Sequence, residues 1–299
     1  MKIITEARDL RGKRVLVRVD WNIADGDTYR IEASMPTIKF LQDSGAIVTL
    51  ATHGDVEAVR QFVPEGCTLL PNLRENPGEE SNSEEFAKSL AEQADIYVNE
   101  AFSVSHREHA SIVGVPKLLP SFAGIRFGEE VSELSKAFNP PHPFLLILGG
   151  AKIETKLPLV EKFSKIADNI FIGGAMALKA NELGLAENYG VMFPTGDLGA
   201  LDANDETLRN LRAKIYEARF IVWNGPLGKY ESGYTKYTVE LAQALALAEA
   251  KVVIGGGDTL AVTKDLNIYD KFAFVSTAGG AMLDFLANGT LPGILALGK

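Results

Sequence analysis

Two lysines near the midpoint of the chain have the type and spacing of an anion-binding site. Lys152 and Lys156 follow an apolar run at 144–148 and a pair of glycines at 149–150. Residues four apart share one face of a helix, so a helix over 152–166 would direct both ammonium groups to the same side. A glycine turn and a helix N-terminus add backbone N–H groups that attract negative charge. The stretch therefore predicts a phosphate-binding site.

Glycine also follows the other strand-like runs in the second half of the chain. It lets the backbone approach a phosphate or an adenine ring closely, and repeated glycine turns at one sheet edge favour a nucleotide site. The chain lacks both a Walker A lysine and the spaced glycines of dinucleotide-binding folds, so neither of those standard sites is predicted. The four additional runs are 169–172, 219–223, 251–254 and 272–275.

Two acidic residues extend the predicted nucleotide site. Asp258 follows three glycines at the start of a helix expected over 258–264. It is expected to cap this helix, to bind a Mg²⁺ ion carried by the nucleotide, or to do both. Glu231 lies in the short sequence Gly-Lys-Tyr-Glu and is either an acceptor for ribose hydroxyl groups or an ordinary surface acid.

Polar residues, rather than glycines, end the strand-like runs of the first half. Parallel strands bring such residues together at one sheet edge, and arginine offers a bidentate fork to carboxylate or phosphate. Each arginine alone is better explained by a surface ion pair, but the whole set favours a site for a small phosphorylated acid. The set comprises Asp20, Asn22, His53 and Arg74 at strand ends, with Arg30 and Arg107 in adjoining loops.

Apolar runs of strand length alternate with helical segments or loops, which is typical of parallel α/β sheets. We expect an α/β protein with two doubly wound, Rossmann-like parallel-sheet domains. A helix over 128–138, stopped by the prolines within 140–143, is predicted to join them as a hinge helix. The expected domains are 1–138 and 139–285.

The overall composition restricts the partners and the location of the protein. The 299 residues carry a formal net charge of −9 without any block rich in lysine or arginine, which argues against nucleic acid or membrane partners. Cys67 is the only cysteine, so a reducing compartment is favoured. The chain has neither a signal-peptide core nor a membrane-spanning run, which indicates a cytoplasmic protein. We expect a monomer.

A basic pocket in one half and glycine turns in the other are the layout expected of a kinase for a small acid. Phosphoryl transfer depends on positioning, on positive charge around the transferred group and on exclusion of water. Lys152 and Lys156 on one side and Arg30 on the other can supply that charge. No protein nucleophile is needed when the substrate's own oxygen attacks.

Several longer motifs of the chain closely resemble those of phosphoglycerate kinase. The segment Arg-Val-Leu-Val-Arg-Val-Asp-Trp-Asn at 14–22 and the segment Gly-Gly-Gly-Asp-Thr at 255–259 are two of them. The motifs occur in the family's order over almost the whole chain, so the resemblance is specific. The remaining matching segments are 72–74, 97–102, 106–111, 148–152, 223–226 and 291–293.

This resemblance implies reversible phosphoryl transfer between 1,3-bisphosphoglycerate and ADP, which gives 3-phosphoglycerate and ATP with Mg²⁺. It implies that Arg30 and Lys152 stabilise the transferred phosphoryl group, that Lys156 holds nucleotide phosphate, and that Asp258 binds the metal. It also implies that the tail 286–299 packs back on the first domain. The implied phosphoglycerate-binding residues are Asp20, Asn22, Arg30, His53, Arg74 and Arg107. The implied nucleotide-binding residues are Gly150, Ala151, Lys152, Lys156, Gly174, Asn224, Pro226, Glu231, Gly257, Asp258 and Thr259.

The chain departs from the family pattern at two places. Family members follow the position of His53 with Leu-Gly-Arg-Pro, whereas this chain has Gly-Asp-Val-Glu at 54–57, so one substrate arginine is missing. Arg60 is a candidate replacement. The excursion within 194–223 is also shortened. These departures leave two alternatives, a non-catalytic nucleotide-binding regulatory protein and a kinase for another small acid.

Overall fold

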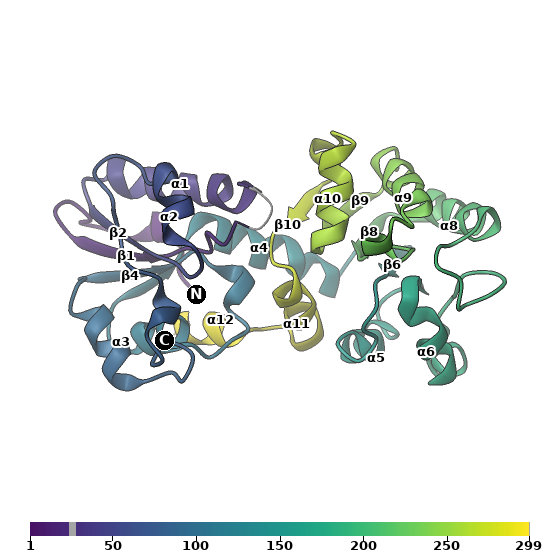
Figure 1. The fold of residues 1–299 in the computed structure, drawn as a ribbon, viewed down its shortest axis with the longest axis horizontal. Helices are drawn as coiled ribbons and strands as arrows, with labels where there is room; N and C mark the ends of the chain where they lie inside the picture. Colours follow the sequence, from purple (N-terminus) through teal and green to yellow (C-terminus); the bar gives the residue numbers. More distant parts are fainter. Residues whose placement is uncertain (24–27, 299) are drawn as a thin grey trace. The chain divides into compact units, whose positions relative to one another are not determined.

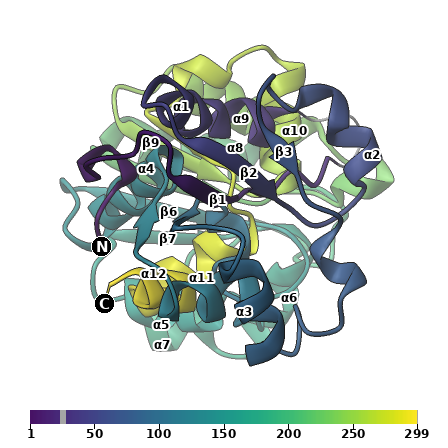
Figure 2. The same cartoon turned by 90° about the vertical axis from the view of Figure 1, so that its left-hand side faces the viewer.

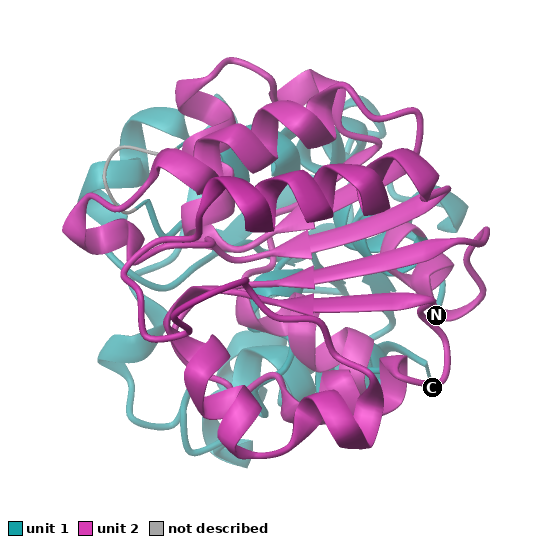
Figure 3. Ribbon diagram, turned by 90° about the vertical axis from the view of Figure 1, so that its right-hand side faces the viewer, with its two compact units in different colours: residues 1–132, 288–299 teal, residues 133–287 magenta. Residues whose placement is uncertain are grey.

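The computed structural model describes residues 1–23 and 28–298 of the chain. The chain divides into two compact units, of which unit 1 comprises Met1–Ser132 and Asn288–Lys299, and unit 2 comprises Glu133–Ala287 (Figure 3). Each unit contains one five-stranded sheet in which all strand pairs are parallel. The expected fold class, two parallel-sheet α/β domains, is therefore confirmed.

The sheet of unit 1 has the strand order β3-β2-β1-β4-β5. Its central strand β1 is buried at Val15, Leu16 and Val17, as expected for a parallel strand that is covered on both faces. The two neighbours of β1, which are β2 and β4, end at the same edge of the sheet as β1 does. The polar residues predicted for the site follow the strands at this edge. The strands are β1 (Arg14–Arg18), β2 (Ile47–Ala51), β3 (Thr68–Leu69), β4 (Ile96–Asn99) and β5 (Ser121–Ala123).

Helices cover both faces of this sheet. Helix α1 lies on one face, and α3 and α12 lie on the other (Figures 1 and 2). Helix α3 is capped by Ser83, whose hydroxyl accepts a hydrogen bond from the Phe86 N–H. The helices of unit 1 are α1 (Tyr29–Asp43), α2 (Val56–Val59), α3 (Glu84–Ala91), α4 (Ile125–Ser135, which continues past the division) and α12 (Pro292–Leu297).

Two helix starts in unit 1 differ from the sequence-based prediction. Helix α1 begins at Tyr29, so Arg30 lies in its first turn and not in a loop, and Pro36 lies inside the helix. Helix α4 begins at Ile125, earlier than the predicted residue 128. The buried carboxyl group of Glu100 accepts hydrogen bonds from the N–H groups of the residues at 126 and 127, at 3.1 and 3.0 Å, and so caps the earlier start.

The last described helix, α12, packs within unit 1. The Gly293 N–H donates to the Ser105 carbonyl at 2.9 Å. A Cβ atom at position 293 would lie 2.7 Å from the Ser105 side chain, so glycine permits this close approach. Ala296 joins a small apolar cluster with Val104 and Ile112. Lys299, the end of the expected tail 286–299, lies outside the described residues.

The sheet of unit 2 has the strand order β10-β9-β8-β6-β7. The central strands β6 and β8 are buried along their whole length, as the continuous apolar runs predict. All five predicted strands are present, and each is followed by the expected glycine-containing turn. They are β6 (Phe144–Leu148), β7 (Asn169–Ile172), β8 (Phe220–Asn224), β9 (Lys251–Gly255) and β10 (Phe274–Ser276).

Helices also cover both faces of the second sheet (Figures 1 and 3). Helices α8, α9 and α10 lie on one face and share an apolar core with Trp223 of β8. No described helix is long and apolar enough to cross a membrane. The helices of unit 2 are α5 (Leu157–Phe163), α6 (Ala177–Glu182), α7 (Leu185–Tyr189), α8 (Asp205–Glu217), α9 (Lys236–Ala246), α10 (Gly257–Asp265) and α11 (Gly280–Asn288, its last residue in unit 1).

The prediction of a helix that starts at residue 152 is wrong. Helix α5 begins at Leu157, and the preceding residues form turns in which the Ile153 carbonyl accepts from the N–H groups of Lys156 and Leu157. Pro158 lies in the first turn of α5, where its missing N–H costs nothing. Because Lys152 and Lys156 both precede α5, they do not share a helical face.

Candidate active site

In unit 1, the loop that follows β1 carries Asp20 and Asn22 and is anchored by a buried tryptophan. The Trp21 N–H donates to the Thr52 hydroxyl at 3.0 Å, which ties the end of β1 to the end of β2. The Trp21 indole N–H donates to the Ser34 hydroxyl of α1 at 2.8 Å. The loop is therefore fixed to both the sheet and a helix.

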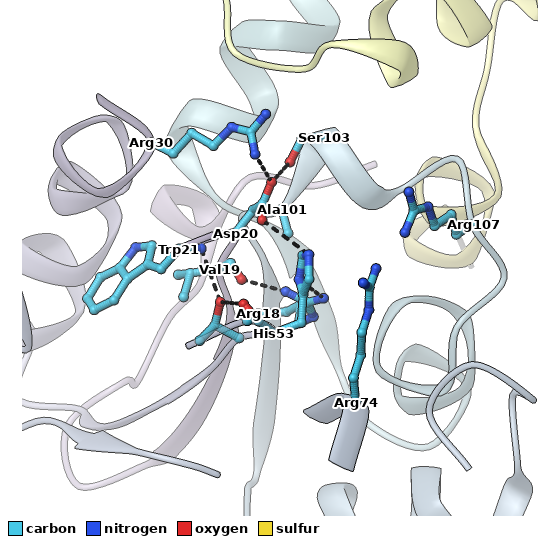
Figure 4. A network of polar contacts seen from close by, with 12 residues as sticks. Arg18, Val19, Asp20, Trp21, Arg30, His53, Arg74, Ala101, Ser103 and Arg107 are labelled. Atoms are coloured by element: carbon cyan, nitrogen blue, oxygen red, sulfur yellow. Dashed lines mark hydrogen bonds and ion pairs between the residues drawn. The ribbon is translucent and has the colours of Figure 1, made fainter. Parts of the chain in front are cut away.

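Asp20 holds Arg30 at the carboxyl edge of the sheet. The Nη1 atom of Arg30 donates to Oδ2 of Asp20 at 2.9 Å, and the Ser103 hydroxyl donates to the same oxygen (Figure 4). Burial by itself raises the pKa of Asp20, but the charge of Arg30 and the hydrogen bond from Ser103 outweigh it, so this pKa lies below its ordinary value. Asp20 is therefore a carboxylate, and it orients the Arg30 guanidinium before any substrate binds.

His53 is buried just after β2, and its neighbours define its protonation. Nη2 of Arg18 lies 3.1 Å from Nδ1 of His53. An arginine can only donate, so Nδ1 is an acceptor without a proton. Burial and the charge of Arg18 lower the pKa of His53 to about 4, although Asp20 opposes this shift. His53 is therefore neutral at pH 7 with its proton on Nε2, which lies 3.7 Å from Oδ1 of Asp20.

Arg18 belongs to this site and was not among the residues singled out from the sequence. Its side chain is fully buried, and its Nε donates to the Ser111 hydroxyl at 2.9 Å. Burial lowers the pKa of Arg18, and the charges of Glu79 and Asp20 oppose this effect. The available signal is that Arg18 interrupts the apolar run 15–19, because a charge inside a buried strand requires partners.

Arg74 and Arg107 are exposed and extend toward the same space beside His53 (Figure 4). Nε of Arg74 lies 3.3 Å from a carboxylate oxygen of the exposed Glu80, and Nε of Arg107 donates to the His106 ring at 3.3 Å. Both charges lower the pKa of His53, so they act on the site electrostatically. An exposed ion pair contributes little, which leaves Arg74 available to a stronger anion.

The shortened loop after His53 is tied to the loop of Arg74. The Asn72 side-chain oxygen accepts from the Gly54 N–H at 3.2 Å and from the Arg74 N–H at 3.1 Å. Gly54 has a φ of +99°, and a Cβ there would lie 3.2 Å from the Asn22 side-chain oxygen. A larger residue at 54 would therefore strain the backbone and displace Asn22, which is exposed at this edge.

Arg60, the candidate replacement for the missing arginine, pairs with Glu57. Its Nη2 and Nε atoms donate to the two carboxylate oxygens at 2.6 and 3.0 Å. Both side chains are exposed, at 60% and 71% of their full area. The structure therefore gives the Arg60 guanidinium a bidentate partner within its own short helical segment.

In unit 2, the glycine turns after β6, β7 and β8 pack directly against one another. The N–H groups of Gly149 and Gly150 donate to the carbonyls of Asn224 and Pro226 at 2.9 and 3.0 Å. A Cβ at position 149 would lie 2.1 Å from the Pro226 carbonyl oxygen, and one at Gly174 would lie 2.6 Å from the Gly150 nitrogen. The expectation that the amides at 149–150 are free for an anion is therefore wrong, because other loops use them.

The two lysines after this turn occupy different environments. Lys152 is exposed, whereas Lys156 is buried and its ammonium group donates to the Gly149 carbonyl. Burial lowers the pKa of Lys156 to about 8, and the charge of Asp258 opposes this effect. Lys156 and Asp258 thus interact across the loops of β6 and β9.

Asp258 lies in the first turn of α10, after Gly256, which has a φ of +104°. Burial raises the pKa of Asp258, as does Glu231, while Lys156 opposes them. The next residue, Thr259, is fully buried, and its hydroxyl accepts from the Gly225 N–H at 2.9 Å. Thr259 therefore fixes the start of α10 against the loop of β8.

A Mg²⁺ ion bound with a nucleotide fits this arrangement better than a metal held by the protein alone. Among the described residues, no cluster of three or more His, Cys, Asp or Glu side chains could hold a metal. Mg²⁺ commonly takes one or two carboxylates and completes its shell with phosphates and water. Asp258, which is half-buried beside a lysine, can supply one such ligand.

The remaining predicted nucleotide residues line or support the same edge of the sheet. Ala151 and Gly257 are exposed, and a Cβ at position 257 would meet nothing within 4 Å. Asn224 is buried, and its side-chain amide lies 3.8 Å from the sulfur of Met282, so it contacts helix α11. Pro226 is buried and receives the bond from Gly150.

A pocket of about 420 Å³ lies elsewhere in unit 1. It is lined by residues 70–73 and 75–77 and by Phe86, Ser89, Leu90 and Gln93. It shares Asn72 with the loop that carries Arg74 but includes none of the predicted site residues. This pocket therefore does not coincide with the predicted site residues.

Comparison with known proteins identifies the family. The phosphoglycerate kinase family profile matches residues 4–57, 54–188 and 186–289. Phosphoglycerate kinase from Coprothermobacter proteolyticus is 32% identical over 381 aligned positions that cover 97% of each chain. The enzyme from Caulobacter vibrioides is 33% identical over 388 positions that cover 98% of each chain. Both alignments exceed the 299 residues of this chain, so the relatives carry segments that it lacks.

Solved structures agree with the sequence relatives. Phosphoglycerate kinase from Coxiella burnetii superimposes with a TM-score of 0.83 at 29% identity, over 99% of this chain and 98% of the other. The enzyme from Pyrococcus horikoshii gives 0.84 at 26% identity with the same coverage. The profile match breaks at 54–57, as expected, and at 186–188, which precedes the segment 194–223 where a shortening is predicted. The chain belongs to the phosphoglycerate kinase family.

Proposed function

We propose that this chain catalyses reversible phosphoryl transfer between 1,3-bisphosphoglycerate and ADP, with unit 1 binding phosphoglycerate and unit 2 binding the Mg²⁺-nucleotide. The observation that carries the proposal is the Asp20–Arg30–His53 cluster at the carboxyl edge of β1 and β2. Its guanidinium and imidazole donors are oriented before any substrate binds, as recognition of a carboxylate and a phosphate requires.

The phosphoglycerate half of the proposal assigns a task to each residue. Arg74 and Arg107 attract the substrate phosphate, since both are exposed and extend toward His53. The Nε2 proton of His53 and the amide of Asn22 bind polar groups of the substrate. Asp20 acts indirectly, by holding Arg30 toward the group to be transferred.

The nucleotide half relies on the loops of β6 and β9. Lys156, buried beside Asp258, holds nucleotide phosphate, and Asp258 supplies a ligand to the Mg²⁺ ion, which neutralises phosphate charge when bound. Exposed Lys152 contacts the transferred phosphoryl group and stabilises the charge that develops on it. Glu231, which influences the pKa of Asp258, accepts from ribose.

We propose three further properties of this chain. We propose helix α4 as the hinge, because the division between the units falls inside it. A cytoplasmic location is supported by the lone Cys67. A monomer is the simplest state for a chain that holds both proposed half-sites.

A coupled assay with 3-phosphoglycerate and MgATP tests this function, and the variant Asp20→Asn tests the cluster that carries it. Loss of the carboxylate frees Arg30, so we expect the KM for 3-phosphoglycerate to rise about tenfold while the KM for ATP stays constant. Asp95→Asn is the matched control, because it removes another Asp–Arg pair of unit 1 that lies at the start of β1.

The outcome also separates the alternatives. Turnover of 3-phosphoglycerate by the wild-type chain excludes the non-catalytic regulatory protein. Nucleotide binding in a calorimeter without phosphoglycerate binding would instead support it. A substrate panel in which another small acid is preferred would identify the third possibility.

A further inference from the structure

A line of buried polar groups continues inward from His53 and ends at an acid that the proposed function does not use. Nε of Arg18 donates to the Ser111 hydroxyl at 2.9 Å. The Ser111 hydroxyl in turn donates to Oε1 of Glu79 at 2.5 Å, and the Ser111 N–H donates to Oε2 at 2.9 Å. Arg18, Ser111 and Glu79 are each no more than 1% exposed.

Each hydrogen bond in this line has only one possible direction. A serine hydroxyl has one proton, and the carboxylate of Glu79 accepts it, so the lone pairs of the hydroxyl face Arg18. With its Nε directed to Ser111, the planar guanidinium has a fixed orientation. Its Nη1 then donates to the Val19 carbonyl, and its Nη2 donates to Nδ1 of His53.

We propose that Glu79 and Ser111 are positioning residues that, acting through Arg18, hold His53 as the neutral tautomer with its proton on Nε2. Nε2 lies 3.7 Å from Oδ1 of Asp20, within the proposed Asp20–Arg30–His53 cluster, and its proton serves there as a fixed donor to a carboxylate or phosphate. The use made of this donor rests on the proposed function, whereas the tautomer itself depends only on the buried contacts.

The groups around His53 keep its ring neutral, so the network determines which ring nitrogen carries the single proton. Burial disfavours a second proton on the ring most, three arginines from different segments add to this effect, and Asp20 opposes it, so the pKa of His53 is lowered. Glu79 lies behind Arg18 and compensates the buried guanidinium charge. The charged groups that act on His53 are Arg18 of β1, Asp20 of the following loop, Arg74, and Arg107.

The test is the ¹⁵N NMR spectrum of the His53 ring in the full-length protein without substrate. The wild type should show a proton on Nε2 and an unprotonated Nδ1. In Ser111→Ala, Nε of Arg18 loses its acceptor and the guanidinium is no longer held in one orientation. We therefore expect a mixture of both tautomers of His53. The KM for 3-phosphoglycerate should rise about tenfold, as for one lost hydrogen bond to a charged group, with the KM for ATP unchanged.

Two further variants keep the test decisive. Ser111→Thr retains a hydroxyl and should restore the wild-type tautomer. Glu79→Gln keeps the side-chain size and one acceptor oxygen, and should shift the tautomer in the same direction as Ser111→Ala; it carries the test if Ser111→Ala does not fold. The control is Ser105→Ala, which removes a buried hydroxyl from the same region that bonds to Asn99 and not to Arg18.

An Nδ1 proton on His53 in the wild type, or an unchanged tautomer in both Ser111→Ala and Glu79→Gln, would overturn the proposal. Because the NMR measurement needs no substrate, it is independent of turnover. A shifted tautomer in a chain without kinase activity would support the network and reject the proposed function. Kinase activity in a chain whose His53 tautomer does not change in these variants would support the proposed function and reject the network.

Discussion

The candidate anion sites of the two units consist of different kinds of groups. In unit 1 the site consists of side chains, and its central members Arg18, Asp20 and His53 are buried and hydrogen bonded before any ligand arrives. In unit 2 the edge consists of glycine turns that pack on one another, with Lys156 and Asp258 set among them. A buried network suits a small rigid acid that needs directional donors.

The difference also shows why the glycines are required. Those at 149, 174 and 225 allow the loops after β6, β7 and β8 to approach closely. The Gly225 N–H in turn donates to the Thr259 hydroxyl, which fixes the start of α10 next to Asp258. The glycine at 257, by contrast, has open space around it and is exposed. Within one edge, therefore, some glycines serve packing and others leave room for a ligand.

The largest effect is expected from Lys152→Ala, which removes the exposed cation proposed to act on the transferred group. Turnover should fall by about 10²–10³-fold, as for loss of one preorganised charge-stabilising donor. Nucleotide affinity, measured by calorimetry, should change little, because Lys156 remains. An equal loss of turnover and affinity would mean that Lys152 binds the ground state.

A glycine substitution separates packing from ligand access. Gly149→Ala places a Cβ 2.1 Å from a backbone carbonyl oxygen, so we expect a loss of stability of about 3 kcal/mol in urea unfolding. Gly257→Ala is the matched control, because its Cβ would meet nothing within 4 Å and should leave stability almost unchanged. Equal stability of the two variants would contradict the interlocked arrangement of the turns.

The pH dependence of nucleotide binding distinguishes Lys156 from the arginines of unit 1. The pKa of Lys156 in the free protein is lowered to about 8, so its charge is present below that pH and is lost above it. Nucleotide affinity should therefore decrease above pH 8, by at most about tenfold per unit. Lys156→Arg should remove this dependence, since arginine stays charged. A flat wild-type profile would argue against a role for the Lys156 charge.

The smallest effect is expected from Arg60→Ala. The Arg60 guanidinium is engaged by Glu57 on the exposed surface, so the KM for 3-phosphoglycerate should change less than about twofold. Glu57→Ala, which frees Arg60 without removing it, is the informative companion. A large rise in KM for Arg60→Ala would show that Arg60 does replace the missing arginine.

The sequence is sufficient to predict most strands of the two sheets and the residues at their edges, but the short strand β5 is not predicted from it. Continuous apolar runs such as 144–148 and 220–223 identify buried parallel strands, because such strands are covered on both faces. The polar residues directly after the strands of unit 1, such as Asp20 and His53, then follow from topology alone. Their positions and the family are both found without the structure.

The features that the sequence does not reveal depend on contacts between distant segments. Periodicity places Lys152 and Lys156 on one helix, but Ile153 is buried in a turn that delays α5 to Leu157. The pair of glycines at 149–150 resembles an open anion loop, yet loops more than seventy positions later in the chain occupy its N–H groups. The side-chain partners of Arg18, Ser111 and His53, lie in other segments, so no local pattern indicates them.

Helix α12 gives the molecule an order of assembly. A ribosome makes all of unit 2 between the two parts of unit 1, so unit 2 can fold before unit 1 has its helix α12. That helix packs on the loop that contains Ser105, close in sequence to Ser103 and Arg107. The nascent chain therefore completes the support of the loop that carries Ser103 and Arg107 only after unit 2 has been made.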